Sequence, residues 1–543
     1  MKIDNAKRIL FLGVFVLIIA LAGGCAPVDR WGVPNPDYDR HAEENASPPV
    51  DIADRFQPQM ADSPPVEAPP PEQPLALSIE AVLMTTLRNN PDLQIQRLNP
   101  VIAGTFERIE RGKYDPELFA EFAYAEETAN ETSRATGEQF DVEGTDTTAA
   151  AGVRQDIPTG TTLEATLERD RNRSNRAPDQ RTTRLGLSIT QNLLRGFGPA
   201  VNLVSIRQAE LDTLASIYEL RGFTETLVAD TEIAYWNYVL AREEISIYES
   251  SLEVARKQRD EIEEQIDVGL LPDTEAAAAR TEVARREQAL IDARSLMEER
   301  RLRLTNLINF KESMGSDRQI DATTAPSIDP QPITDRTDRV ALAEKSRHDL
   351  AEARLRMNQG NLETIATRNG MLPKLDLFID LGRTGYAESF SAAFKELNDN
   401  TYNFSAGLRL SHYLGNRKAK ARHEAAWTRQ IQAERALENL RQIVQLDVRL
   451  ALNEVARTRQ QIAASRATRR LEEQTVRAEK ERFNVGASTA LLVAQAQRDL
   501  LASQIAEIRA IINYRISLVE LYLAEGSLLQ RRGITIGDPQ ANR

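Results

Sequence analysis

The chain has very few of the side chains that usually build catalytic or metal centres. Its 543 residues include one cysteine, Cys25, which excludes an internal disulfide. The four histidines, His41, His348, His412 and His423, are scattered, and no paired-histidine spacing, glycine-rich phosphate loop or serine elbow accompanies them. We therefore expect no metal site, no cofactor and no catalytic residue, and predict that the protein is not an enzyme.

The chain also has fewer basic residues than acidic ones. The chain has 68 lysine and arginine residues against 81 aspartate and glutamate residues, which gives a formal net charge of −13. A protein with this balance does not offer the broad basic groove that binds nucleic acid. We therefore expect no nucleic-acid partner.

The apolar run near the N-terminus is too short to span a bilayer comfortably. It extends from Ile9 to Ala22, follows basic residues and ends before Cys25, which predicts a cleaved export signal over residues 1–24. The segment resembles a bacterial lipoprotein signal. The resemblance implies that Cys25 is acylated and anchors the mature chain in outer-membrane lipid, a destination that Ala26 permits. Cleavage elsewhere and an uncleaved anchor are the alternatives.

Proline is unevenly distributed along the chain. Half of the 24 prolines lie between residues 26 and 75, among acidic residues and without hydrophobic periodicity. Such a segment cannot bury enough apolar surface to offset chain entropy, so we predict a disordered tether that begins at the lipidated cysteine.

The rest of the chain contains an internal duplication. Segments 90–93 and 116–118 return in loose form 257 residues later, segment 186–189 returns 221 residues later, and several residues between 234 and 282 return 217 residues later. Each copy is too thin to bury its own apolar stripe, which favours packing of like against like within an oligomer. The expected parts are a signal at 1–24, a tether at 25–75, a first repeat at 76–315, a linker at 316–333, a second repeat at 334–527 and a tail at 528–543.

Each repeat contains a pair of predicted strands. Apolar and mostly polar residues alternate at 375–382 and 402–411, and the first repeat has equivalents at about 117–126 and 182–192. The pattern suits a membrane β-barrel with lipid outside and water inside, although a soluble half-buried hairpin gives the same alternation. The first repeat is 36 residues longer here, and alternation at 163–168 predicts an added hairpin that either widens the barrel or forms an outer loop.

Very long helices account for most of the remaining sequence. No proline occurs between residues 203 and 268, and apolar residues recur there at spacings of three and four, as in a coiled coil. The counterpart in the second repeat runs from about 418 to 484. A helix of about 65 residues is roughly 100 Å long.

Both long helices are expected to end at short glycine-containing turns, after which a second helix runs back. These turns, 268–272 and 485–489, place glycine where a positive φ ends a helix. The predicted fold class is therefore mainly α with a membrane β-barrel: a duplicated helix–strand hairpin–helix unit whose coiled coils form a long α-barrel that a trimeric transmembrane β-barrel continues.

The order of these segments resembles the TolC-type outer-membrane efflux proteins over about residues 77 to 525. The resemblance rests on the sequence Asn-Pro-Asp-Leu at 90–93, a proline-led strand, a second strand ending at 191–194, a long helix, and the sequence Arg-Phe-Asn-Val-Gly at 482–486. It implies a homotrimer with a periplasmic tunnel, which acts as a passive exit duct of a tripartite efflux or type I secretion system. The implied partners are a periplasmic adaptor and an inner-membrane transporter.

The resemblance also implies two kinds of site. The adaptor would contact the turns, whose family pattern is valine, glycine, leucine or alanine, then serine or threonine. The matching residues are Val268, Gly269, Leu270, Val485, Gly486, Ala487 and Ser488. In the first turn Leu271 replaces the small hydroxyl residue, and both turns can also be simple helix reversals.

The second implied site is a constriction of the tunnel. Some family members have two aspartates on the last return helix, where Leu492 and Gln495 stand here. Asp273 and Glu275 occupy the related place in the first repeat, where three copies would attract cations. They can equally be favourable charges at a helix N-terminus, and Leu492 can instead form an apolar constriction.

One other class of protein remains open. A lipid-anchored periplasmic coiled-coil scaffold or adaptor also combines helices with strands, but it usually inserts one helical hairpin between halves of its β domains. The alternation of two helical hairpins with two strand hairpins favours the channel. The sequence does not reveal the cargo or the class of pump.

Overall fold

The computed structural model describes residues 59–60, 75–132, 134, 136–175, 177–309, 319–326, 335–387, 392 and 401–536. All of them belong to one structural unit, Ile52–Arg543. Cys25, the export signal and most of the predicted tether lie outside the described residues.

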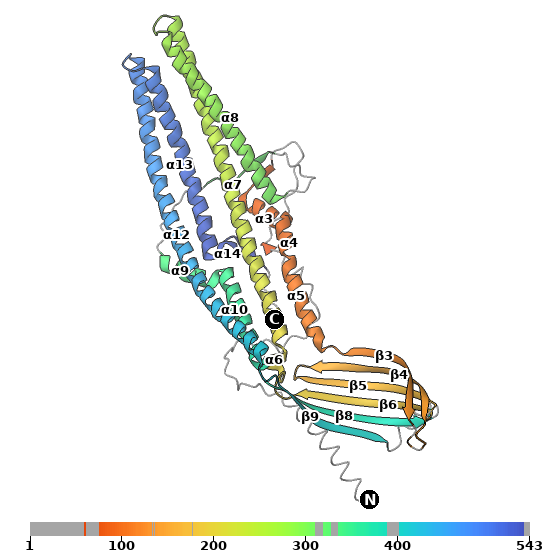
Figure 1. Ribbon diagram of the computed structural model, residues 1–543. Coiled ribbons are helices and arrows are strands. Elements are labelled where there is room, and N and C mark those ends of the chain that lie inside the picture. Colours follow the sequence, from red (N-terminus) through yellow and green to blue (C-terminus); the bar gives the residue numbers. More distant parts are fainter. Residues whose placement is uncertain are drawn as a thin grey trace. The chain divides into compact units, whose positions relative to one another are not determined.

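Two long helical hairpins dominate the chain (Figure 1). The first joins α7 (Val204–Asp267) to α8 (Thr274–Ile308), and the second joins α12 (Arg417–Asn484) to α13 (Ala490–Glu525). The 64 residues of α7 and 68 of α12 confirm the predicted long helices. The two hairpins pack side by side through contacts of α13 with α7 and α8. In each repeat the chain passes from the sheet into the long helix and then into a turn. The length of the helix therefore separates the sheet from the turn.

Shorter helices precede the strands of each repeat and pack along α7 and α12. They are α3 (Ile79–Asn89), α4 (Pro91–Gln96), α5 (Leu98–Arg111), α9 (Arg336–Ser346) and α10 (His348–Gly370). The Asn-Pro-Asp-Leu motif begins α4: the Asn90 side chain accepts a 3.0 Å hydrogen bond from the Leu93 N–H, and Pro91 occupies the first helical position. Single turns complete the helices: η1 (Gly112–Tyr114), α6 (Pro199–Asn202) and α14 (Leu528–Arg531).

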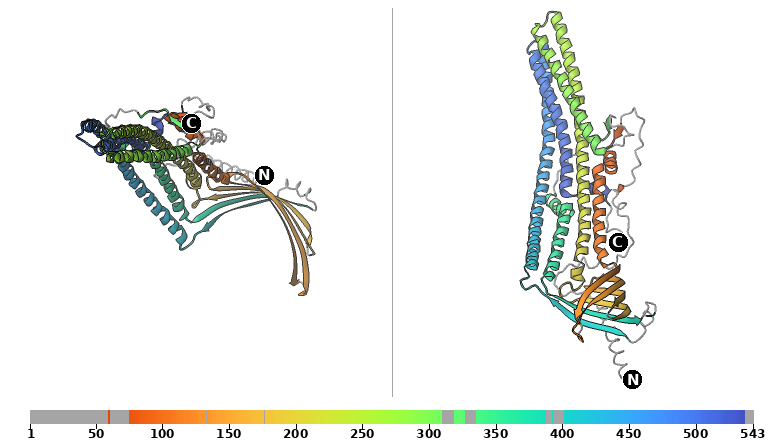
Figure 2. Two further views of the ribbon diagram at one scale, coloured as in Figure 1. Left: turned by 90° about the horizontal axis from the view of Figure 1, so that it is seen from above. Right: turned by 45° about the vertical axis from the view of Figure 1, so that its right-hand side comes forward.

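One antiparallel six-stranded sheet contains all the long strands, and Figure 2 shows that it is curved. Its order is β3-β4-β5-β6-β8-β9. The strands are β3 (Glu117–Thr132), β4 (Gln139–Ile157), β5 (Thr161–Ser174), β6 (Ala177–Asn192), β8 (Lys374–Ala387) and β9 (Tyr402–Ser411). The four predicted strands are thereby confirmed, and three of them extend beyond the predicted bounds. The extra segment of the first repeat forms β4 and β5, which lie inside the sheet between β3 and β6, so it is not an outer loop.

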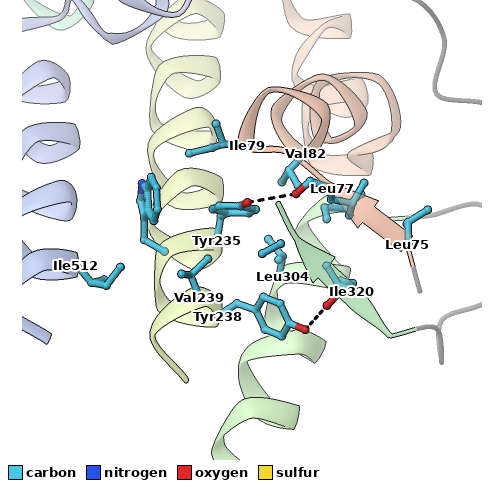
Figure 3. Packing of buried hydrophobic residues seen from close by; sticks show 13 residues of the cluster. Leu75, Leu77, Ile79, Val82, Tyr235, Tyr238, Val239, Leu304, Ile320 and Ile512 are labelled. Atoms are coloured by element: carbon cyan, nitrogen blue, oxygen red, sulfur yellow. Dashed lines mark hydrogen bonds between the residues drawn. The ribbon is translucent and has the colours of Figure 1, made fainter. Parts of the chain in front are cut away.

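Two short strand pairs complete the described structure. Parallel strands β2 (Leu75–Leu77) and β7 (Ile320–Ala322) lie against the middle of α7, and β1 (Gln59–Met60) pairs with β10 (Ile534–Thr535). In Figure 3 the Tyr235 hydroxyl donates to the Leu77 carbonyl at 3.2 Å, and the Tyr238 hydroxyl donates to that of Ile320. The phenols thus satisfy strand carbonyls in an otherwise apolar cluster.

Among the helices in the described ranges, none has the length and apolar character needed to cross a membrane.

Candidate functional site

The first helical turn has the backbone of a Schellman motif. After α7 the Gly269 N–H donates to the Ile266 carbonyl at 2.8 Å, and the Leu270 N–H donates to the Gln265 carbonyl at 2.8 Å. Gly269 has a φ of 75°, in the left-handed region where glycine carries no Cβ penalty. The glycine therefore sets the point at which the chain leaves the helix.

The second turn repeats this conformation 217 residues later. The Gly486 N–H donates to the Phe483 carbonyl at 2.9 Å, the Ala487 N–H donates to the Arg482 carbonyl at 2.8 Å, and Gly486 has a φ of 72°. The Thr489 side chain then caps α13 by accepting from the Leu492 N–H. Both predicted helix reversals are present, and their backbones match although their sequences differ after the glycine.

Both turns present apolar side chains to solvent. Val268 is 65% exposed, Leu270 74% and Val485 77%. Leu271, which replaces the hydroxyl residue of the family pattern, packs instead against the small core formed by Ile262, Ala279 and Ala490. Apolar groups held at the end of a charged helical hairpin are typical of a surface that binds another protein.

Glu275 connects the two turns. Its Oε2 accepts a 3.1 Å hydrogen bond from the Ala490 N–H at the start of α13, so an acid of the first hairpin caps a helix of the second. Asp273 is the N-cap residue of α8, but its side chain makes no capping hydrogen bond. In the second turn the Ser488 hydroxyl donates to Glu479 at 2.9 Å. The structure thus brings Glu275, but not Asp273, into a contact between hairpins.

The other two constriction candidates lie on an open face of α13. Leu492 is 47% exposed, and Gln495 is exposed three residues later, on the same side of the helix. Neither belongs to the apolar clusters in which the two hairpins meet.

One face of the sheet is apolar across every strand. The strand registers place a continuous row of apolar side chains on one face: Leu118, Val153, Ala165, Leu187, Leu381 and Phe404. Leu118 is 81% exposed and Phe404 49%, in the single chain. A row of this kind requires an apolar environment over the whole width of the sheet.

The opposite face carries a polar row. On every strand its member is the sequence neighbour of the residue in the apolar row. It consists of Glu117, Arg154, Glu164, Ser188, Asp380 and Ser405. The Arg154 Nε donates to Glu164 at 2.8 Å, and Asp380 accepts from the hydroxyls of Ser188 at 2.7 Å and Ser405 at 3.2 Å. These bonds across strands hold polar side chains in a row on a face that suits water.

A feature of this polar face that sequence reasoning missed occurs once in each repeat. Phe119 lies opposite Gly152 with the Arg154 guanidinium 5.2 Å from its ring, and Phe378 lies opposite Gly407 in the same way, with Arg409 at 5.4 Å. A Cβ on either glycine would collide with the phenyl ring. The shared spacing, an arginine two residues after a strand glycine, was the signal available in the sequence.

The part of the chain that the structure describes holds no group of three or more histidine, cysteine or acidic side chains able to bind a metal ion.

Comparison with known proteins gives a consistent result. The family model for outer membrane efflux proteins matches residues 128–309 and 340–527. The solved outer-membrane channel OprN superposes with a TM-score of 0.62 at 15% identity, over 83% of this chain and 90% of that chain. The CmeC outer membrane channel of Campylobacter jejuni gives 0.61 at 16%, over 86% and 90%. The outer membrane protein VceC of Vibrio cholerae gives 0.60 at 15%, over 82% and 96%.

At these identities the solved structures establish the fold, and the search of curated proteins finds no match. The family model, by contrast, matches most of the chain and both of its repeats. The chain belongs to the outer membrane efflux protein family, and it is an outer-membrane efflux channel rather than an enzyme.

Proposed function

We propose that three copies of this chain form a passive exit duct that docks a periplasmic adaptor and, through it, an inner-membrane pump. The observation that carries the proposal is the two-sided sheet, with an apolar row and a polar row that both cross all six strands. Helical hairpins long enough to extend such a pore are attached directly to its strands.

The edges of the sheet support closure by neighbouring copies. Within the described residues β3 and β9 each pair with one strand only, and they run in opposite directions, β3 away from the helices and β9 toward them. An open edge cannot lie in lipid because its backbone groups would lack partners. Pairing β9 of one copy with β3 of the next is antiparallel, and three six-stranded sheets would close a barrel of eighteen strands.

The turns are the proposed docking surface. Val268, Leu270 and Val485 supply apolar contacts, and Gly486 with Ala487 leaves room for a partner helix to approach closely. Ser488, already bonded to Glu479, lies at the margin of this surface.

We place the constriction of the duct beside the same turns. The exposed Leu492 and Gln495 are available to line the axis in a trimer. The hydrogen bond from the Ala490 N–H to Glu275 holds the two hairpins together, so opening the duct would require this bond to break. Asp273 is exposed nearby and would add negative charge.

Cys25 is the proposed lipid anchor, attached to the body by the proline-rich tether. Metabolic labelling with a radioactive fatty acid should mark the wild-type chain and leave the variant Cys25→Ser unlabelled. Label retained by the variant would place the acyl group elsewhere.

The proposal is tested by oligomeric state, conductance and crosslinking together. We expect a heat-resistant trimer in outer-membrane fractions and single-channel conductance in planar bilayers. Because Cys25 is the chain's one cysteine, Ser488→Cys adds the one internal thiol, and a thiol-directed crosslinker should capture the adaptor from it. The variant Ser405→Cys, on the sheet, is the matched control and should capture none. A monomer without conductance would favour the scaffold instead.

A further inference from the structure

The apolar face of the sheet ends at a cluster of arginines. On β8, apolar side chains occupy this face from Leu375 to Leu381, and the next residue on the face is Arg383. On β5 the apolar series ends at Leu167 and continues with Arg169 and Arg171. The registers place Arg171 opposite Arg181 of β6, and Arg383 opposite Leu185. Arg169, Arg171, Arg181 and Arg383 form what we call the arginine belt.

The belt has a strong excess of positive charge. On the same face of β5, β6 and β8 the described acidic side chain is Asp179, which accepts hydrogen bonds from Arg171 at 3.1 and 2.8 Å and from Arg181 at 3.4 Å. Arg169 and Arg383 are exposed. A concentration of guanidinium groups on one face creates a positive potential that attracts anionic ligands.

The level of the belt is that of lipid headgroups. Arg383 is the ninth residue of β8 counted from Leu375, and a tilted strand crosses the apolar core of a bilayer in about 9 to 11 residues. The belt lies at the strand ends remote from the helices, which is the outer leaflet if the helices are periplasmic. Tyr402, 62% exposed, lies opposite Arg383, as an aromatic residue does at a membrane interface.

The belt faces away from the polar row, so a solute in the lumen would not meet it. An arginine can lay its apolar stem along a hydrocarbon surface while its guanidinium stays at the headgroups. The planar guanidinium donates two parallel hydrogen bonds to a phosphate, which a lysine cannot do. Asp179 fixes the orientation of Arg171 for such a contact.

We propose that the arginine belt binds the phosphate groups of phosphorylated lipids in the outer leaflet that surrounds the channel. The proposal rests on the membrane position given under the proposed function, and it adds a lipid-binding site on the outside of the sheet. Three copies would surround the trimer with twelve arginines, four from each. Bound lipid would seal the boundary between protein and membrane at this level.

The test compares two sets of charge removals in the full-length purified protein. The belt variant is Arg169→Gln, Arg171→Gln, Arg181→Gln and Arg383→Gln, and the matched control removes four charges from the polar face: Arg154→Gln, Arg184→Gln, Lys374→Gln and Arg409→Gln. Native mass spectrometry with lipid A that carries two phosphates counts bound lipid. We expect binding to the belt variant to weaken roughly tenfold or more, and binding to the control to stay unchanged.

Further probes separate lipid phosphate from free phosphate. Lipid A with one phosphate removed should bind more weakly to the wild type, and inorganic phosphate alone should not displace the lipid at equal concentration. Equal loss in both variants, unchanged binding to the belt variant, or displacement by inorganic phosphate would each overturn the proposal. If the belt variant does not assemble, the pair Arg169→Gln and Arg383→Gln, which keeps the Arg171–Asp179 contact, takes its place.

Failure of the proposed function would look different. If the wild-type protein forms no trimer and conducts no ions, the sheet does not have the membrane position on which this proposal rests. If the protein is trimeric and conducts ions but shows no preference for phosphorylated lipid, the proposed channel function stands and only lipid binding by the arginine belt is overturned.

Discussion

Glu225 Oε1 accepts a 2.9 Å hydrogen bond from the backbone N–H of Leu528, which lies 303 residues later in the chain. Glu225 is 3% exposed, on α7, and Leu528 begins α14. The Nε2 of His348, at the start of α10, lies 3.6 Å from the other carboxylate oxygen. One buried carboxyl group thus joins the first repeat, the second repeat and the C-terminal segment.

Burial shifts the pKa values of both side chains in this contact. Burial raises the pKa of Glu225 to about 7, although the Leu528 and Leu529 N–H groups oppose the shift. Burial lowers the pKa of His348 to about 4, and the neighbouring Arg221 adds to the decrease. Both groups are therefore held in their neutral forms over part of the physiological range.

We first predict that Glu225→Gln flattens the alkaline side of the stability profile. Because the pKa of Glu225 is raised in the folded state, its stabilising contribution is complete below about pH 4.5 and is lost as the pH rises through 7. The loss amounts to about 3 kcal/mol for the shift involved. Thermal unfolding of the detergent-solubilised protein should show a midpoint that falls between pH 5 and 8 in the wild type, and falls less in the variant.

His348→Gln is the matched control for the opposite limb. Because the pKa of His348 is lowered, its contribution is complete above about pH 6.5 and is lost as the pH falls through 4. This variant should flatten the acidic side and leave the alkaline side unchanged. Identical profiles for both variants and the wild type would show that the contact does not control stability.

The second prediction concerns the turn glycines. An alanine at Gly486 would keep a φ of 72°, which costs about 1 kcal/mol, although no atom lies within 4 Å of the added Cβ. Gly486→Ala should therefore accelerate hydrogen exchange at the turn and reduce adaptor capture from Ser488→Cys. Gly486→Asn should behave like the wild type because asparagine tolerates this conformation.

Gly360→Ala is the control for that prediction. Gly360 lies inside α10, and a Cβ there would meet Gln430 Cα at 3.8 Å, an ordinary contact. Alanine is the better helix former, so this variant should be as stable as the wild type or slightly more stable. Normal docking by Gly486→Ala would mean that the turn conformation does not matter for the partner.

The third prediction uses the two faces of the sheet. Ile379 lies on the apolar face, well inside the band, so Ile379→Arg should oppose membrane insertion by about 2 to 4 kcal/mol. Ser405→Arg adds the same side chain to the polar row on the next strand and should be tolerated. The amount of trimer recovered from outer membranes measures the difference. Equal recovery of the two variants would mean that the apolar face does not contact lipid.

Much of this fold could be predicted because its signals are local. Helix periodicity gave α7 and α12 within about one residue of their ends, and a glycine after each helix located the turns. The alternating residues of β8 and β9 were equally clear. By contrast, the added hairpin was predicted without bounds for its first strand, β4, because the central residues 147–152 of β4 are threonine, alanine and glycine, without alternation. This segment is a strand because β3 and β5 pair with it on both sides.

The features that sequence reasoning missed depend on registers and long-range contacts. The arginine belt exists only because Arg171 meets Arg181 across two strands. The contact between Glu225 and Leu528 depends on where α14 packs against α7. Glu275 was singled out as an acid near the axis, whereas its hydrogen bond to the Ala490 N–H required both hairpins to be in place.

The last prediction is that the channel prefers cations. The polar face of the described strands carries more acidic than basic side chains, namely Glu117, Glu121, Glu127, Glu131, Asp146, Asp156, Glu164, Glu168, Asp170, Asp376 and Asp380 against Arg154, Arg184, Lys374 and Arg409. In a potassium chloride gradient the reversal potential should indicate a potassium preference. Neutralising Glu164, Glu168 and Asp170 should reduce the potassium preference, because these changes remove three negative charges. They also remove the Glu164 carboxylate that accepts the hydrogen bond from Arg154. Asp179→Asn, on the opposite face, should leave the preference unchanged, and an equal shift from that control would place the selective charges outside the lumen.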